Sequence, residues 1–192
     1  MEANKKAVFF DRDGTLIEDK HYLKDPEQVV FFDDAIECLR LLKEAGFLIV
    51  VVSNQSGVAR GMMTEQDVCR VNARFCAMAE EAGVSIDAVY YCPHLETGSV
   101  AEYAIDCSCR KPKPGMAEQA AKDLGLDLSS SYMVGDKAAD VLFAVNSGMK
   151  KAFLVPTGYG LREKEKTKGI DKAEAVASLR EAVLKILEVA SL

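Results

Sequence analysis

Short apolar runs alternate along the chain with longer segments whose apolar residues recur at helical spacing. The runs at residues 7–10, 47–52, 88–91, 132–134 and 151–155, with a shorter one at 175–177, predict β-strands. Strands that alternate with helical segments are typical of βα units, which build a mostly parallel sheet. We therefore predict an α/β fold of three layers around a doubly wound, mostly parallel sheet.

The segments between the predicted strands have the apolar periodicity of helices that pack on a sheet. They lie at residues 35–45, 64–82, 116–124 and 138–146, and a last helix begins at Ser178. Thr64 and Asp67 have the spacing of a capping box, weakened because Asp stands where Glu or Gln is usual, and such a box marks a helix start. Three cysteines fall on or near apolar helix faces and are expected to be packing residues: Cys38, Cys69 and Cys76.

Two long stretches do not follow the alternation. Residues 16–33 come after the first predicted strand and residues 93–114 after the third, and loops of this length commonly carry function. The Lys- and Glu-rich run at 162–168 predicts a solvated, mobile surface segment. We find no repeat, low-complexity tract or linker in the sequence, so residues 1–192 are expected to form a single domain.

Composition argues against several classes of partner. Of the 192 residues, 49% are apolar, and 24 basic against 30 acidic side chains give a net charge of −6. Such an acidic chain is a poor general binder of nucleic acid or of anionic membranes. The longest apolar run, 47–52, is too short to span a bilayer, and the start of the chain lacks a secretory apolar segment. We expect a cytoplasmic monomer that acts on a small molecule.

Polar side chains follow three of the predicted strands at the point where each strand ends. Asp11 and Asp13 follow the first strand, Ser53 and Asn54 the second, and Asp136 the fourth. These are ordinary turn residues, but the carboxyl ends of parallel strands share one edge, where ligands bind, so the side chains should converge. Gathered carboxylates repel one another unless a cation joins them, and hard oxygen ligands suit Mg²⁺. The sequence therefore predicts a magnesium site at this edge.

The same acidic residues can perform phosphoryl chemistry. With a cation keeping Asp11 ionised, its carboxylate can act as a nucleophile, as in aspartyl-phosphate enzymes. Asp13 could protonate a leaving alkoxide and then accept a proton from water, help that is typically worth ~10²–10⁴-fold. Asp140, near the start of a predicted helix, is expected to orient a lysine or to compensate the helix dipole.

A cysteine and histidine cluster predicts a second metal site. Cys92, His94, Cys107 and Cys109 offer three thiolates and one imidazole, the donor set that tetrahedral zinc prefers, and four protein ligands make the site structural. We expect a zinc-stabilised loop at about residues 92–109. The basic run that follows begins at Arg110, and the zinc loop would aim its side chains at the carboxylate edge.

Taken together, the motifs Asp-Arg-Asp-Gly-Thr, Ser53-Asn54, Lys111 and Gly-Asp-Lys-x-x-Asp, in this order, resemble the haloacid dehalogenase (HAD) superfamily of phosphotransferases. The resemblance implies that Asp11 forms a phosphoaspartate and that Asp13 is the general acid and base. It also implies that Ser53 and Lys111 hold the phosphoryl oxygens. Asp11, the main chain of Asp13 and Asp136 would bind Mg²⁺, in a HAD-like fold without a large cap.

The zinc loop narrows the resemblance to the branch of histidinol-phosphate phosphatases and heptose-bisphosphate 7-phosphatases. The long spacer 95–106 between the two ligand pairs looks like the heptose enzymes, although Leu95 stands where many relatives have a second histidine. The branch implies substrate contacts from Asp19, Lys20, His21, Tyr22, Ser53, Asn54, Gln55, Ser56, Arg110, Lys111 and Lys137.

Three functions are consistent with these observations. By resemblance, the preferred one is Mg²⁺-dependent hydrolysis of the 7-phosphate of D-glycero-D-manno-heptose 1,7-bisphosphate, a phosphorylated sugar, in the synthesis of nucleotide-activated heptose for lipopolysaccharide or other surface polysaccharide. Histidinol phosphate is the alternative substrate. A zinc-stabilised binding module, in which the carboxylates only cap turns, is the alternative without catalysis.

Overall fold

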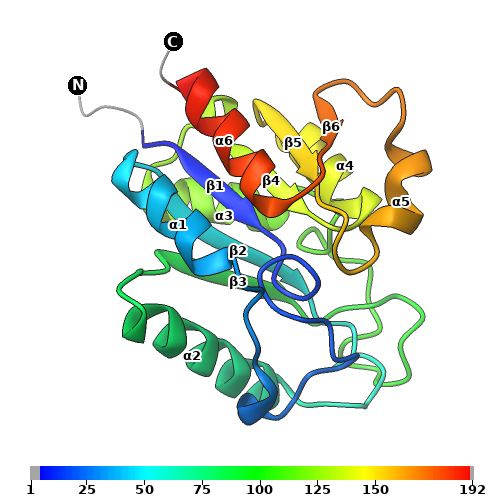
Figure 1. The fold of residues 1–192 in the computed structure, drawn as a ribbon. Helices are drawn as coiled ribbons and strands as arrows, with labels where there is room; N and C mark the ends of the chain where they lie inside the picture. Colours follow the sequence, from blue (N-terminus) through cyan, green and yellow to red (C-terminus); the bar gives the residue numbers. More distant parts are fainter. Residues whose placement is uncertain (1–4, 191–192) are drawn as a thin grey trace.

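A sheet of six parallel strands forms the middle of the molecule in the computed structural model, which describes residues 5–190 (Figure 1). The strand order is β3-β2-β1-β4-β5-β6. The strands are β1 (Ala7–Phe10), β2 (Leu48–Asn54), β3 (Ala88–Cys92), β4 (Tyr132–Gly135), β5 (Lys151–Leu154) and β6 (Ala173–Ala175). Because β2 lies on one side of β1 and β4 on the other, the chain reverses its direction of winding between β1 and β4, where such sheets bind ligands.

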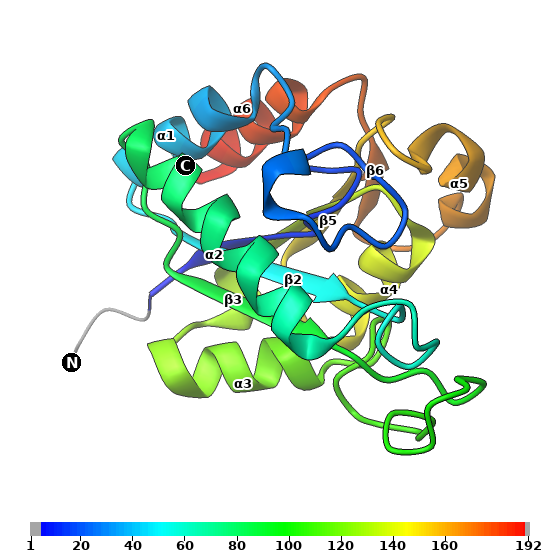
Figure 2. The same cartoon turned by 90° about the horizontal axis from the view of Figure 1, so that it is seen from below.

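Helices cover both faces of the sheet, which gives the predicted three layers (Figure 2). On one face lie α1 (Ala35–Glu44), α2 (Glu65–Glu81) and α6 (Leu179–Ala190), and on the other α3 (Gly115–Leu124) and α4 (Ala138–Asn146). The side chains of β1 alternate between these faces: Val8 and Phe10 join the core under α1 and α6, whereas Ala7 and Phe9 join the core under α3 and α4. Burial on both faces explains why this strand is apolar at every position.

The sequence predicted these elements to within a few residues. Two expectations differ from the structure: one concerns a helix and the other the exposure of a cysteine. The run at 162–168 lies mostly within a helix, α5 (Gly160–Thr167), which contacts α4 and β6. Its Lys and Glu residues are good helix formers, and Lys166 pairs with Glu163 one turn away. Cys38 is buried and Cys76 is half-buried against the same core, but Cys69 is exposed on α2.

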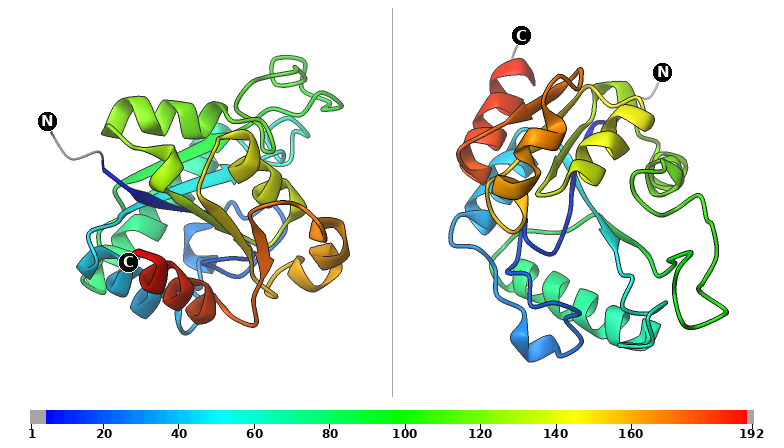
Figure 3. Two further views of the ribbon diagram at one scale, coloured as in Figure 1. Left: turned by 90° about the horizontal axis from the view of Figure 1, so that it is seen from above. Right: turned by 90° about the vertical axis from the view of Figure 1, so that its right-hand side faces the viewer.

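Two long loops lie at the carboxyl end of the strands (Figure 3). The first joins β1 to α1 and contains a short 3₁₀ helix, η1 (Pro26–Gln28); the second, 93–114, joins β3 to α3. A further 3₁₀ helix, η2 (Leu128–Ser130), precedes β4. Within residues 5–190 no cap domain is inserted, and no helix in this range has the length and apolar character needed to cross a bilayer.

Candidate active site

Three buried carboxylates meet beyond the ends of β1 and β4. Asp11 continues β1, its N–H donating to the Val134 carbonyl of β4 at 3.0 Å, while Asp136 follows β4 and Asp140 lies in the first turn of α4. Each offers a carboxylate oxygen within 4.8 Å of the others. The neighbouring strands thus bring Asp11 and Asp136 together at the edge where the sequence placed them.

Two lysines balance this negative charge. The Lys111 Nζ lies 2.7 Å from Asp11 Oδ1 and 2.6 Å from Asp140 Oδ1, while Lys137 Nζ lies 3.6 Å from Asp11 Oδ2. Burial alone would raise the pKa of Asp11, but the two ammonium groups hold it below its usual value. Burial likewise disfavours charge on Lys111, yet the acids around it raise its pKa. Asp11 is therefore an ionised carboxylate in a largely dry site, the state that a nucleophile requires.

Asp136 has the environment of a cation ligand. Burial and the proximity of Asp11 raise its pKa to about 7, so the two carboxylates repel each other in the absence of a bound cation. Gly14 and Gly158 flank its carboxylate so closely that a Cβ atom on either would lie 2.6 or 2.2 Å from Oδ2. Two buried oxygen donors in a narrow site fit Mg²⁺.

Asp140 is already occupied by the protein. Its Oδ1 accepts from Lys111, and its Oδ2 accepts the Lys137 backbone N–H at 3.0 Å, an N-terminal contact of α4. This arrangement matches the expectation that Asp140 orients a lysine. Asp136 also has protein contacts: its Oδ2 accepts the Tyr159 backbone N–H at 2.8 Å, and its Oδ1 lies 3.2 Å from the ammonium of the partly exposed Lys137.

The side chain of Asp13 lies apart from this cluster. It accepts from both Arg12 and Gln55, the latter at 2.9 Å, and lies 3.5 Å from the Ser53 hydroxyl. A contribution of residue 13 to the metal would therefore come from its main chain, while its side chain lines the cleft with Asp11. Two carboxylates of one short motif thus have separate surroundings.

These residues line a cleft of about 390 Å³. The sequence-predicted residues on its walls are Asp11, Asp13, Asp19, His21, Tyr22, Ser53, Asn54, Gln55, Ser56, Arg110, Lys111 and Lys137. Lys20 is outside this set, since its ammonium pairs with Glu18 on the surface, and Asp136 is fully buried below the cleft. Asp140, expected to orient a lysine, also lines the cleft, and sequence reasoning missed four further lining residues: Leu23, Gly57, Ala139 and Tyr159. Tyr159 could have been found, because it follows the fifth strand at the same edge.

The side chain of Asn54 holds the backbone of Lys111. Its amide donates to the Lys111 carbonyl and accepts the Lys111 N–H, both at 3.0 Å, so both polar ends of this side chain are used. The Lys111 ammonium also donates to the Val52 carbonyl at 2.7 Å. Main chain and side chain of Lys111 are both anchored to the end of β2.

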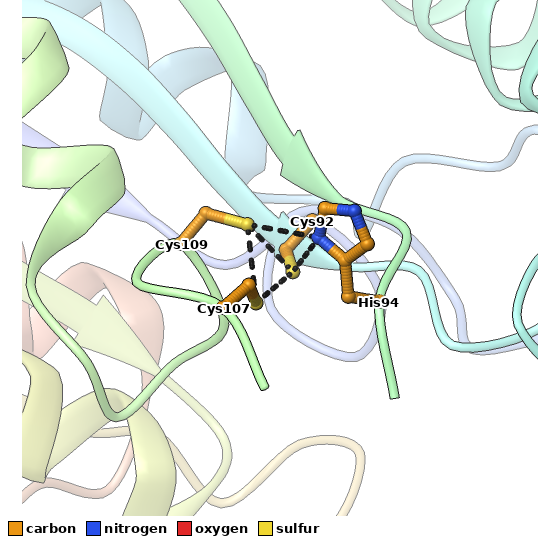
Figure 4. Close-up of side chains that lie close together, drawn as sticks. All are labelled: Cys92, His94, Cys107 and Cys109. Carbon is orange, nitrogen blue, oxygen red and sulfur yellow. Dashed lines mark hydrogen bonds between the residues drawn. The ribbon is translucent and has the colours of Figure 1, made fainter. Parts of the chain in front are cut away.

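The four predicted zinc ligands point toward one another (Figure 4). The sulfur of Cys109 lies 2.9 Å from Cys92 and 3.4 Å from Cys107, and 3.3 Å from the Nδ1 of His94. Tetrahedral zinc with bonds of about 2.3 Å sets sulfurs roughly 3.8 Å apart, so the cluster needs little expansion to hold the ion. The hydrogen bond between Cys92 and Cys109 lowers the pKa of Cys109 to about 5 and raises the pKa of Cys92, so it favours a thiolate at Cys109 only. The donor set fits zinc.

The cysteine cluster is connected to the cleft and to α2. Arg110, next to Cys109, donates from Nη1 to the His94 carbonyl at 3.0 Å and reaches the cleft wall. Tyr103, whose ring lies 6.2 Å from that of His94, donates to Glu65 of α2 at 2.9 Å. A metal at the cluster would therefore hold the loop segment that carries both Arg110 and Lys111.

Comparisons with known proteins give one consistent result. Residues 108–182 match the HAD-hydrolase-like family. The chain is 43% identical over 175 residues to D-glycero-beta-D-manno-heptose-1,7-bisphosphate 7-phosphatase of Pasteurella multocida, covering 91% of this chain and 95% of that protein. It is 38% identical over 185 residues to the enzyme of the same name from Escherichia coli K12, covering 96% and 97%.

A solved structure has the same arrangement of the chain. D,D-heptose 1,7-bisphosphate phosphatase from B. bronchiseptica, solved with magnesium and phosphate, superimposes with a TM-score of 0.83 at 26% identity. The match covers 96% of this chain and 99% of that one. The similarity therefore extends over the two loops as well as over the sheet.

Proposed function

Because the chain belongs to the HAD-like phosphatases, among relatives that are heptose-bisphosphate 7-phosphatases, we propose that it hydrolyses the 7-phosphate of D-glycero-D-manno-heptose 1,7-bisphosphate. It is a phosphoric monoester hydrolase. The observation that carries the proposal is Asp11, an ionised carboxylate that lines the cleft and is held 2.7 Å from the Lys111 ammonium. This geometry presents a nucleophile and a phosphoryl-binding cation to the same group.

Mg²⁺, which the B. bronchiseptica structure contains, would be held by Asp11 and Asp136, whose carboxylates lie close together, and by the main chain of Asp13. When bound, it neutralises charge on the transferring phosphoryl group. Zinc at Cys92, His94, Cys107 and Cys109 has a structural role, since all four ligands come from the protein. The metal-held loop places Arg110 and Lys111 in the cleft.

The reaction has two steps. In the first, an Asp11 oxygen bonds to phosphorus, the bond from phosphorus to the sugar oxygen breaks, and Asp13 gives that oxygen a proton. In the second, Asp13 takes a proton from a water molecule whose oxygen bonds to phosphorus, and the Asp11 acyl phosphate breaks into free Asp11 and phosphate. Ser53 and Lys111 hold the phosphoryl oxygens throughout.

Basic side chains on the cleft wall support a bisphosphate. Arg110 and Lys137 provide cations besides Lys111, and His21 of the first loop also lines the cleft. A second phosphate thus finds its own partners while the first occupies the floor. The relatives also favour a heptose bisphosphate over histidinol phosphate. Such a route would place the enzyme in the cytoplasm, where nucleotide-activated heptose for surface polysaccharide is made.

Steady-state kinetics test the proposal. With Mg²⁺, we expect kcat/KM for heptose 1,7-bisphosphate to exceed that for histidinol phosphate, with phosphate released from C7. Asp11→Asn should abolish turnover while the protein stays folded by circular dichroism. A clear preference for histidinol phosphate would reject the substrate. Full activity of Asp11→Asn would reject Asp11 as the nucleophile, whereas no phosphatase activity in the wild-type protein would reject the enzyme and leave a binding module.

A further inference from the structure

A fully buried arginine lies directly behind Asp13. Arg12 has no exposed surface, is the largest fully buried side chain in the described part of the chain, and does not line the cleft. Burial of a guanidinium is costly unless its charge is paired and its N–H groups are hydrogen-bonded. The partners of the Arg12 guanidinium therefore indicate what this residue does.

The Arg12 guanidinium joins Asp13 to helix α2. Its Nε and Nη2 donate to Asp13 Oδ2 at 3.1 and 2.9 Å, and Nη2 also lies 3.1 Å from Oδ1. On its other side, Nη1 donates to the Oδ1 of Asn72 in α2 at 2.6 Å. The planar fork can make both sets of contacts only in one orientation, so Asn72 fixes the guanidinium and the guanidinium fixes the carboxylate.

This arrangement makes the two oxygens of Asp13 unequal. Oδ2 accepts from Arg12 and also from Gln55 at 2.9 Å, whereas Oδ1 has a single contact, at 3.1 Å. The side chain is 17% exposed and lines the cleft. Oδ1 is therefore the oxygen with capacity left to carry a proton toward a leaving group.

We propose that Arg12, braced by Asn72, is a positioning residue that fixes the carboxylate of Asp13 so that Oδ1 delivers the proton to the departing sugar oxygen. The inference rests on the proposed function, in which Asp13 is the general acid. Arg12 acts through Asp13 and not on substrate, because it lies outside the cleft wall. It is distinct from Arg110, which lines the cleft.

Leaving-group dependence tests this role separately from stability. An alkoxide needs a proton in order to leave, whereas p-nitrophenolate leaves without one, and kcat/KM reports the steps up to release of the alcohol. For Asn72→Ala and Arg12→Lys, we expect kcat/KM to fall roughly 10- to 100-fold on an alkyl phosphate such as the sugar bisphosphate. On p-nitrophenyl phosphate it should fall less than about 3-fold. Across a series of aryl phosphates, the dependence on leaving-group pKa should become steeper.

Two further variants complete the design. Arg74→Ala removes a surface ion pair of the same helix, with Glu81 at 3.1 Å, and should leave the dependence unchanged. In an Asp13→Asn background, Asn72→Ala should not make the dependence of kcat/KM on leaving-group pKa any steeper, because both changes remove the same function. Thermal unfolding of each variant identifies misfolded protein. Asn72→Ala is expected to disturb folding less than Arg12→Lys does.

Equal losses on good and poor leaving groups in folded Asn72→Ala and Arg12→Lys would overturn the inference, since that is the signature of a purely structural role. Additive steepening in the Asp13→Asn background would also overturn it. The aryl series needs no sugar substrate, so the result stands even if the natural substrate is another phosphomonoester. A wild-type enzyme without activity on any phosphomonoester would instead reject the proposed function.

Discussion

The ammonium group of Lys111 is shared between two acids with different tasks. Asp11 lines the cleft, and Asp140 belongs to the first turn of α4, so Lys111 lies between the proposed nucleophile and a helix. Because Asp140 also pairs with Lys111, the ion pair between Lys111 and Asp11 is weaker. The charge of Asp140 is thus expected to affect catalysis through Lys111.

We predict that Asp140→Asn lowers kcat roughly 10- to 100-fold, because Lys111 then pairs more fully with Asp11 and shifts from its working position. The free energy of unfolding should fall by about 1–3 kcal/mol, as expected for a disturbed buried network. Steady-state kinetics and urea unfolding measure both effects.

A matched control is available in α2. Asp67→Asn also changes the third residue of a helix, where Asp67 caps the exposed start of α2 at Thr64. It should affect stability only. Unchanged kcat in Asp140→Asn, or an equal loss in Asp67→Asn, would contradict the shared-lysine account.

At this scale the sequence located most of the site. The rule that polar residues after parallel strands converge identified Asp11, Ser53, Asn54 and Asp136, because such convergence follows from topology alone. It could not show that the Asn54 amide is used by Lys111, nor that Arg12 contacts Asn72, 60 residues further along. Those contacts depend on how the loop 93–114 and α2 pack, which no local pattern encodes.

Among the larger elements, the loop 93–114 has little regular structure of its own. Hydrogen bonds from Tyr103 to Glu65 and from Arg110 to the His94 carbonyl are among the contacts that attach it. The remaining order would come from metal ligation, which in small loops contributes directly to folding. Metal removal should therefore affect both stability and the cleft.

We predict that the purified protein contains one zinc ion per chain and that Cys107→Ser, or treatment with a strong chelator, lowers the melting temperature. The value of kcat/KM should fall about 10-fold or more, because Arg110 and Lys111 lose their placement. Metal analysis, calorimetry and kinetics test this. Cys69→Ser, which changes an exposed cysteine outside the cluster, should change none of the three. Protein free of zinc with full activity would refute the prediction.

An ion-pair network joins the edge strand β6 to β5 and to α6. Glu174 of β6 accepts from Lys151 of β5 at 2.5 Å and from Lys185 of α6 at 3.0 Å. Hydrogen bonds from these lysines hold the pKa of Glu174 below its usual value. A carboxyl group whose pKa is lowered by folding stabilises the protein above its unfolded pKa, and this contribution is lost as pH falls through the folded pKa.

We therefore predict that Glu174→Gln lowers the free energy of unfolding by about 0.5–1 kcal/mol at pH 7 and by much less near pH 3. Urea unfolding at the two pH values measures the difference. High salt should reduce the effect at pH 7, since the lysines are partly exposed. An effect of equal size at both pH values would show that the network contributes packing and not charge.

For the molecule as a whole, hydrophobic periodicity alone led to the correct layers. Runs buried on both faces identified the central strands, and helix spacing between them fixed the parallel connections. The chain order of β3-β2-β1-β4-β5-β6 was not predicted, because pairing between strands depends on packing across the sheet. The run at 162–168 was interpreted as a mobile surface segment because it is rich in Lys and Glu, yet most of it belongs to α5, which contacts α4.

The proposed nucleophile, general acid and phosphoryl-binding residues, Asp11, Asp13, Ser53 and Lys111, all line one cleft of this chain. We therefore predict that the enzyme is active as a monomer, so that specific activity does not vary with protein concentration across a dilution series. Sedimentation velocity under assay conditions should show a single species near 20.9 kDa. Activity that disappears on dilution together with a larger species would show that a second copy completes the site.

The two glycines that flank Asp136 limit how this enzyme can diversify. Any side chain at Gly14 or Gly158 would enter the space of the carboxylate, and both residues have a positive φ that other residues rarely adopt. Libraries that randomise this floor should thus yield almost only inactive clones. New substrate preferences should arise instead from the first loop and from the segment around Arg110. The residues that can change during evolution and the residues that perform the reaction therefore lie in separate parts of the same cleft.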